Sequence, residues 1–71
     1  MTFMAYMEKL ETIKYLSQHK RTGTVEMLAG KLSVSERTTR RMVQQLRERG
    51  FLIEYNRLRY TYEVKDASKK D

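Results

Sequence analysis

The sequence predicts a mainly α-helical fold that ends in a small β-hairpin, and two observations predict it. Apolar residues recur at three- and four-residue steps in three successive segments, which is the spacing of helices that each bury one face. After Gly50 the period changes to two, which is the spacing of strands. A chain of 71 residues has room for one such domain.

The first helix is predicted at about residues 3–19. Its buried stripe is expected to consist of Phe3, Tyr6, Leu10, Ile13 and Leu16. Residues 20–23 break this pattern, and the segment 21–24 could add a short third strand to the hairpin.

The second helix is predicted at 25–32, with Thr24 as its N-cap. Its buried side would consist of Val25, Leu28, Ala29 and Leu32. Ser33 and Val34 leave room only for a tight turn, after which Ser35 can cap a third helix at 36–49. Gly50 suits the left-handed position that follows a helix end.

Two strands of a hairpin are predicted within residues 51–64, joined near 56–58. Four of their side chains are expected to close the core: Phe51, Ile53, Tyr60 and Tyr62. The order of three helices and a hairpin is the layout of a winged helix-turn-helix, which is expected to span residues 1–64. The charged tail 65–71 lacks apolar anchors, so it is expected to be disordered.

Composition excludes several kinds of chemistry. The chain has no cysteine, so it can form neither a disulfide nor a thiolate metal site. No metal or cofactor is expected, and no motif positions two carboxylates for acid–base catalysis, so the chain is not expected to be an enzyme. His19, the lone histidine, stands at a helix end, where contact with the helix terminus is the usual role. Without a long apolar run or a signal peptide, a cytoplasmic protein is expected.

The net charge of +6 is concentrated in the middle of the chain, where eight cations and three anions lie between Lys20 and Arg49. On a helical wheel one side of the third helix is apolar or small and faces the core: Thr39, Met42, Val43 and Leu46. The opposite side carries Arg37, Arg41, Gln44 and Glu48, and Thr38 and Gln45 flank it. Contacts with base edges are expected from the residue types that hydrogen-bond to them: Arg37, Thr38, Arg41, Gln44 and Gln45. Phosphate contacts are expected from a second set: Ser35, Arg40, Arg47, Arg57, Arg59, Lys20 and Arg21.

Three stretches of the sequence carry a known pattern: Leu28-Ala29-x-x-Leu32-x-Val34-Ser35, Arg37-Thr38-Thr39-Arg40-Arg41 and Leu46-x-x-x-Gly50-Phe51-x-Ile53. Together they resemble the DeoR-type and related bacterial winged helix-turn-helix domains. The run Gly50-Phe51-Leu52-Ile53-Glu54-Tyr55 looks most like the amino-terminal domain of WYL-type transcriptional regulators. The resemblance covers about residues 7–64 and implies sequence-specific DNA binding by a transcription factor, with the third helix in the groove.

The sequence departs from this family in two places. Ser33 stands where the family usually has glycine, which predicts a slightly different or strained turn. The wing is short and lacks glycine, so phosphate contact is expected of it and deep insertion into a minor groove is not.

Double-stranded DNA is therefore the expected partner. One recognition helix covers only about four base pairs, which predicts a homodimer. Met4, Met7 and Tyr15 lie off the buried stripe of the first helix and are the expected contacts. No small-molecule ligand is expected. The alternative is a winged helix that docks on proteins without binding DNA, because fold alone does not decide function. RNA binding is a weaker third option, since the major groove of duplex RNA is too deep and narrow for a helix and no platform of exposed aromatic residues is evident.

Overall fold

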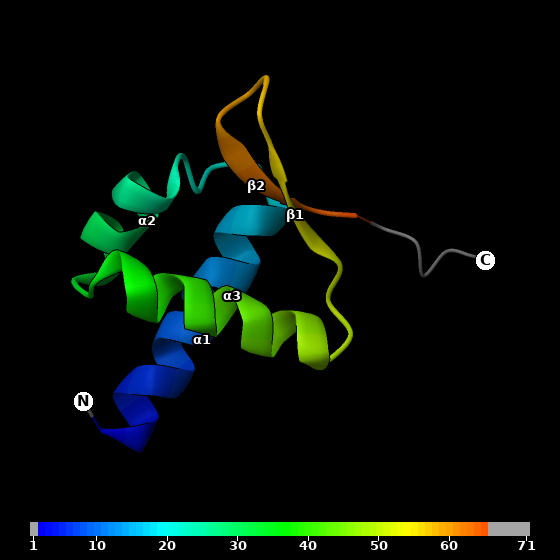
Figure 1. Cartoon of the computed structure of the whole chain (residues 1–71). Helices are drawn as coiled ribbons and strands as arrows, with labels where there is room; N and C mark the ends of the chain where they lie inside the picture. The colour runs from blue at the N-terminus through cyan, green and yellow to red at the C-terminus, as the bar shows by residue number, and fades with distance from the viewer. Residues whose placement is uncertain (1, 66–71) are drawn as a thin grey trace.

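A computed structural model describes residues 2–65. The elements follow in the order α1 (Phe3–Gln18), α2 (Val25–Leu32), α3 (Glu36–Glu48), β1 (Ile53–Asn56) and β2 (Thr61–Val64). In Figure 1, α3 crosses α1, α2 lies beside the amino-terminal end of α3, and the antiparallel hairpin follows its other end. This arrangement confirms the predicted fold class, a winged helix-turn-helix. The prediction for the tail concerns residues 66–71, which lie outside the described residues.

One hydrophobic core joins all five elements. Its buried apolar residues are Leu10, Ile13, Leu28, Leu32, Met42, Val43, Leu46, Ile53 and Tyr62. Phe51 and Leu16 are partly buried and pack against this cluster. Each element contributes at least one side chain, so the position of α3 relative to α1, α2 and the hairpin is fixed by packing.

The first turn of α1 differs from the expectation. Thr2 caps the helix, since its hydroxyl oxygen accepts a hydrogen bond from the Ala5 amide at 3.0 Å. Phe3 was expected on the buried stripe, yet 75% of its surface is exposed. The expectation was wrong because the first turn of α1 extends past the helix that crosses it (Figure 1). Tyr6, one turn further on, is already partly buried against the core.

The helices share one way of ending. After α2, Ser33 adopts the left-handed conformation, with φ of 58° and ψ of 41°. Its amide donates to the Gly30 carbonyl at 3.2 Å, and the next amide donates to the Ala29 carbonyl at 3.1 Å. This is the Schellman arrangement. Lys20 and Gly50 hold the same left-handed position after α1 and α3, with φ of 58° and 103°.

The hairpin turn lies later in the sequence than predicted. Asn56 pairs with Thr61, so residues 57–60 form the turn and Tyr60 precedes the second strand. Tyr60 was expected to close the core, but it has a φ of 55° and is 65% exposed. That expectation was wrong because Tyr60 belongs to the turn. Glu63 is buried instead, and its carboxylate accepts a hydrogen bond from the Asn56 side-chain amide at 3.0 Å.

The expected third strand at 21–24 is absent from the described residues, where the sheet consists of β1 and β2. The segment is attached to β2 through side chains. The hydroxyl oxygen of Thr22, a fully buried residue, accepts from the Tyr62 amide at 2.7 Å and lies 3.0 Å from the Thr61 hydroxyl. The Gly23 amide donates to the same Thr61 hydroxyl at 3.2 Å. Threonine hydroxyls therefore replace the backbone ladder that a strand would have formed.

Candidate nucleic-acid interface

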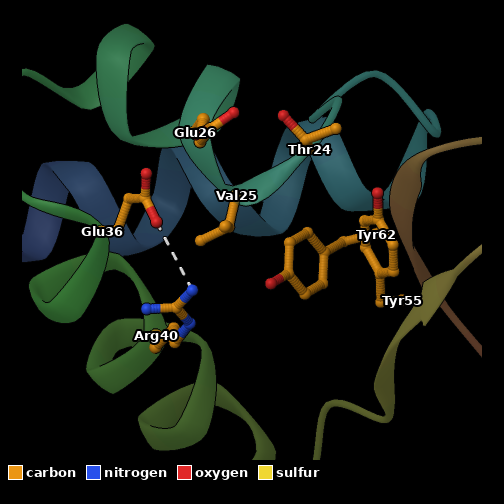
Figure 2. A pocket seen from close by; sticks show the side chains of 7 residues that line it. All are labelled: Thr24, Val25, Glu26, Glu36, Arg40, Tyr55 and Tyr62. Carbon is orange, nitrogen blue, oxygen red and sulfur yellow. Dashed lines mark hydrogen bonds and ion pairs between the residues drawn. The ribbon is translucent and has the colours of Figure 1, made fainter.

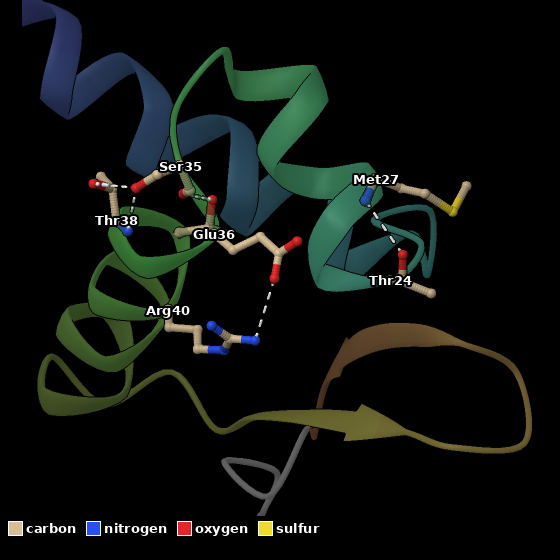
Figure 3. A network of polar contacts seen from close by, with 7 residues as sticks. Thr24, Met27, Ser35, Glu36, Thr38 and Arg40 are labelled. Carbon is tan, nitrogen blue, oxygen red and sulfur yellow. Dashed lines mark hydrogen bonds and ion pairs between the residues drawn. The ribbon is translucent and has the colours of Figure 1, made fainter.

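Helix α3 is held with one face inward and the other free. Its buried residues are the four that the helical wheel predicts: Thr39, Met42, Val43 and Leu46. Ser35 caps the helix, because its hydroxyl oxygen accepts a hydrogen bond from the Thr38 amide at 3.1 Å (Figure 3). A helix fixed at its cap and along its buried face presents its outer side chains from a rigid base.

The outer face of α3 brings together the residues predicted to read bases. Arg37, Arg41, Gln44 and Gln45 are exposed, and Thr38 is partly buried. One edge of this face forms a groove of about 380 Å³ with α1, lined by Tyr6, Thr38, Arg41, Gln44, Gln45 and Glu48. Fork-shaped guanidinium groups and side-chain amides thus lie on one exposed side of α3, and these are the groups that read the edges of base pairs.

Tyr6 adds a residue from α1 to this surface. Its hydroxyl donates to the Gln45 side-chain carbonyl oxygen at 2.7 Å, across a sequence separation of 39 residues. The bond fixes the side-chain orientation of Gln45 and turns its NH₂ group away from Tyr6. Sequence reasoning placed Tyr6 on the buried stripe and missed this role. The signal was its hydroxyl, because a tyrosine at the edge of a core usually needs a polar partner.

At the amino end of α3, Ser35 is less available for a phosphate contact than expected. The hydroxyl of Ser35, which was expected to contact phosphate, donates to the Thr38 hydroxyl at 3.1 Å as well as capping the helix. Glu36 follows directly, in the first turn of the helix. Because Ser35 is engaged in the cap and a carboxylate stands next to it, a phosphate at this end would depend on other donors.

Arg40 faces the hairpin side of α3. Its guanidinium lies 3.4 Å from the Glu36 carboxylate, an exposed pair that contributes little to stability. Both residues line a groove of about 460 Å³ between the start of α2, α3 and the hairpin, together with Thr24, Val25, Glu26, Tyr55 and Tyr62 (Figure 2). Burial raises the pKa of the Tyr62 phenol, while the charges of Arg40 and Arg47 oppose the shift. The Tyr62 phenol is therefore harder to ionise than a free tyrosine, and Arg40 borders the same groove.

Arg47 has a structural contact that the sequence did not indicate. Its Nε atom donates to the Ile53 carbonyl at 2.7 Å, which ties the end of α3 to the start of β1. The residue remains exposed, and its guanidinium carries further N–H groups that could reach a phosphate.

The remaining expected phosphate contacts lie away from α3. Arg57 and Arg59 are exposed in the hairpin turn. Lys20 and Arg21 are exposed just after α1, beside the hairpin, where the Arg21 carbonyl accepts a hydrogen bond from the Lys31 ammonium at 2.7 Å. The structure thus places the cations that are expected to contact phosphate in three regions: α3, the hairpin turn and the end of α1.

The expected dimer contacts do not form one patch. Met4 and Tyr15 are exposed, but Met7 is partly buried and packs against the core, so its placement on an exposed side was wrong. Met4 and Tyr15 lie eleven positions apart in the sequence, which is about 16 Å along the helix axis. Tyr15 instead contacts His19, with ring centroids 4.4 Å apart.

Residues 2–65 hold no group of three or more side chains able to ligate a metal ion. No helix in the same range is long and apolar enough to cross a membrane.

The fold and this surface define a class of protein, the helix-turn-helix domains. A family model described as an HTH domain matches residues 8–60, which is most of the chain. The chain belongs to this family of helix-turn-helix domains, whose typical role is DNA binding in regulators. Comparison with curated proteins and with solved structures returned no match.

Proposed function

We propose that this chain binds double-stranded DNA in a sequence-specific manner, as a small bacterial transcriptional regulator or as the DNA-binding part of one. The observation that carries the proposal is the outer face of α3, where arginine and glutamine side chains stand on a helix whose opposite face is buried. A helix of 13 residues with such a face fits the major groove, which admits one α-helix.

The base-reading roles follow from the hydrogen-bonding groups. Arg37 and Arg41 can each donate two hydrogen bonds to O6 and N7 of a guanine, and Gln44 can pair with N6 and N7 of an adenine. Gln45 differs, because its carbonyl oxygen already accepts from Tyr6. We therefore assign Gln45 to a base that offers an acceptor to its NH₂ group, with Tyr6 as the residue that positions it. Thr38 completes the set at the edge of the face.

The phosphate contacts are assigned by position. Arg40 and Arg47 flank the base-reading face on its hairpin side, and Arg57 and Arg59 extend from the wing. Lys20 and Arg21 lie just after α1, so they could contact only a DNA phosphate that approaches that end of the helix. Each cation that neutralises a phosphate releases a counterion, so the affinity should fall steeply as salt is raised.

Three further parts of the proposal rest on the motif and on the size of the domain. The resemblance favours a regulator of the DeoR or WYL type, acting in the cytoplasm on the nucleoid. One recognition helix reads too few base pairs to select a site in a genome, so we propose a homodimer. The exposed Phe3 and Met4 in the first turn of α1 support a dimer contact at that end of the helix. Met7 would back this contact from the core, and Tyr15 lies too far along the helix to belong to it.

Two substitutions at one position test the assignment of α3. Arg41→Lys keeps the charge and removes the two-pronged donor, whereas Arg41→Ala removes both. We expect both variants to lose about 1–3 kcal/mol of preference for the selected sequence over its single-base variants, and only Arg41→Ala to lower the salt dependence. Fluorescence anisotropy on matched duplexes measures both quantities.

A substitution in the wing is the control for the Arg41 variants. Arg57→Ala, in the wing, should weaken binding to all duplexes alike and reduce the salt slope by about one unit. Equal losses on every sequence from the Arg41 variants would refute the base-reading role. Absence of binding to any duplex at low salt would favour the alternative, a winged helix that docks on another protein.

A further inference from the structure

The tip of the hairpin combines apolar exposure with positive charge. Leu58 is 91% exposed, the largest exposed fraction among the large apolar side chains of residues 2–65. Arg57 and Arg59 stand on either side of it in the sequence, and Tyr60, which is 65% exposed, completes the turn. A solvated turn would gain nothing from a leucine in this position, since the exposed side chain buries no apolar surface.

This tip is held in a defined shape. The Asn56 side-chain oxygen accepts hydrogen bonds from the Leu58 amide at 2.9 Å and from the Arg59 amide at 3.1 Å. The side-chain amide of Asn56 in turn donates to the carboxylate of Glu63, a buried residue of β2, at 3.0 Å. The exposure of Leu58 therefore belongs to an ordered turn, which presents the side chain before any partner arrives.

A suitable partner must offer an apolar surface between negative charges. The minor groove of duplex DNA does so where a base step unstacks, because the apolar faces of the two base pairs then become accessible and a phosphate backbone runs along each wall. Proteins that bend DNA use this arrangement, with an apolar side chain between two base pairs and arginines beside it. The wing is also attached to α3, since β1 packs against that helix and Arg47 of α3 donates to the Ile53 carbonyl at 2.7 Å, so a duplex held by α3 would lie on the part of the domain that carries the wing.

We propose that the wing tip inserts Leu58 as a wedge into the minor groove beside the site read by α3, and that the wedge partly unstacks one base step and bends the duplex. Arg57 and Arg59 contact the phosphates around that step. The inference rests on the proposed DNA binding and goes beyond the expectation that the wing contacts phosphate. It also predicts a preference for a flexible pyrimidine–purine step at a fixed distance from the α3 site, because such steps unstack most easily.

The experiment uses the whole chain and a duplex chosen by selection from a random library. Donor and acceptor dyes at the two ends report bending, and 2-aminopurine placed at the candidate step reports unstacking as a rise in fluorescence. We expect a bend of about 20–90° with the wild-type chain. Leu58→Ser should abolish the bend and the fluorescence rise and should lose the preference for the flexible step, while the bases read by α3 stay the same.

Two control variants make the result specific. Leu58→Met keeps an apolar wedge and should keep the bend. Leu52→Ser removes an exposed leucine outside the turn and should also leave the bend unchanged. The inference is overturned if the wild-type chain binds a straight duplex, or if Leu58→Ser bends DNA as the wild type does. If the wild-type chain binds no duplex, the proposed function fails and the wedge fails with it.

Discussion

Replacement of Ser33 by glycine should stabilise the domain. Ser33 is a non-glycine residue in the left-handed conformation, and it is exposed. A residue with a Cβ atom loses about 1–2 kcal/mol in that conformation. Glycine avoids this cost but adds about 0.5–1 kcal/mol of backbone entropy to the unfolded chain. The difference predicts that Ser33→Gly raises the free energy of unfolding by about 0.5–1 kcal/mol.

Thermal and urea unfolding followed by circular dichroism measure this effect. In a domain of this size 1 kcal/mol corresponds to about 4–8 °C, so the midpoint should rise by about 2–8 °C. Ser33→Ala is the matched control, because it removes the hydroxyl and keeps the Cβ atom, and it should not stabilise. Gly50→Ala is the converse, at the same position after α3, where an added Cβ meets no atom within 4 Å and the loss is purely conformational. A Ser33→Gly variant that unfolds at a lower temperature than the wild type would refute the reasoning.

Three further changes have defined outcomes. Gly30→Ala should raise the free energy of unfolding by about 0.5–1 kcal/mol, because Gly30 is exposed within α2 and an added Cβ meets nothing within 4 Å; urea unfolding that shows no gain would contradict this. Thr22→Val should cost about 1–3 kcal/mol, since it leaves the buried Tyr62 amide without its acceptor; a neutral result in the same assay would mean that another group replaces the hydroxyl. Tyr6→Phe should leave the unfolding midpoint nearly unchanged but broaden the base preference at one position, because Gln45 loses its 2.7 Å hydrogen bond; an unchanged preference in selected duplexes would exclude Tyr6 from specificity.

The pH dependence of stability gives a fifth prediction. Burial raises the pKa of the Tyr62 phenol above its ordinary value of 10.0. The neutral phenol therefore contributes stability that is complete below pH 10.0 and is lost as the pH rises through the folded-state pKa, because the unfolded chain releases the proton first. Urea unfolding at rising alkaline pH should show a smaller loss in Tyr62→Phe than in the wild type. An equal loss in both proteins would assign the alkaline sensitivity to other groups.

The helices could be predicted from the sequence because their signals are local. Thr24 and Ser35 each accept the capping hydrogen bond that their residue type favours, and the inward face of α3 follows from its period. Ser33 takes the left-handed position even though it is not glycine, because the hydrogen bonds of the Schellman motif fix the backbone there.

The expectations that failed depend on contacts between distant parts of the chain. The exposure of Phe3 depends on how far α1 extends past α3, which no periodicity records. The alternating pattern of the hairpin does not say where the turn falls, and Tyr60 was assigned to a strand for that reason. The segment 21–24 was expected to add a strand to the hairpin, yet Thr22 is joined to β2 through its hydroxyl, which accepts from the Tyr62 amide.

In the candidate site, too, the features of a single helix could be predicted and the contacts between distant segments could not. Spacing on a single helix was enough to group Arg37, Arg41 and Gln44 on one face. The contacts of Gln45 with Tyr6 and of Arg47 with the Ile53 carbonyl join segments that the sequence does not show to be neighbours. Such contacts decide which donors remain available to DNA, so the sequence indicates the chemistry of the surface and the fold decides which atoms present it.

Selection from a random duplex library at two salt concentrations tests the central claim, sequence-specific DNA binding through α3, most directly. We expect that one sequence motif is enriched at the higher salt, that it is palindromic or repeated if the chain acts as a dimer, and that the affinity falls steeply with salt. Recovery of duplexes without any shared motif, or no binding at the lower salt, would contradict the claim.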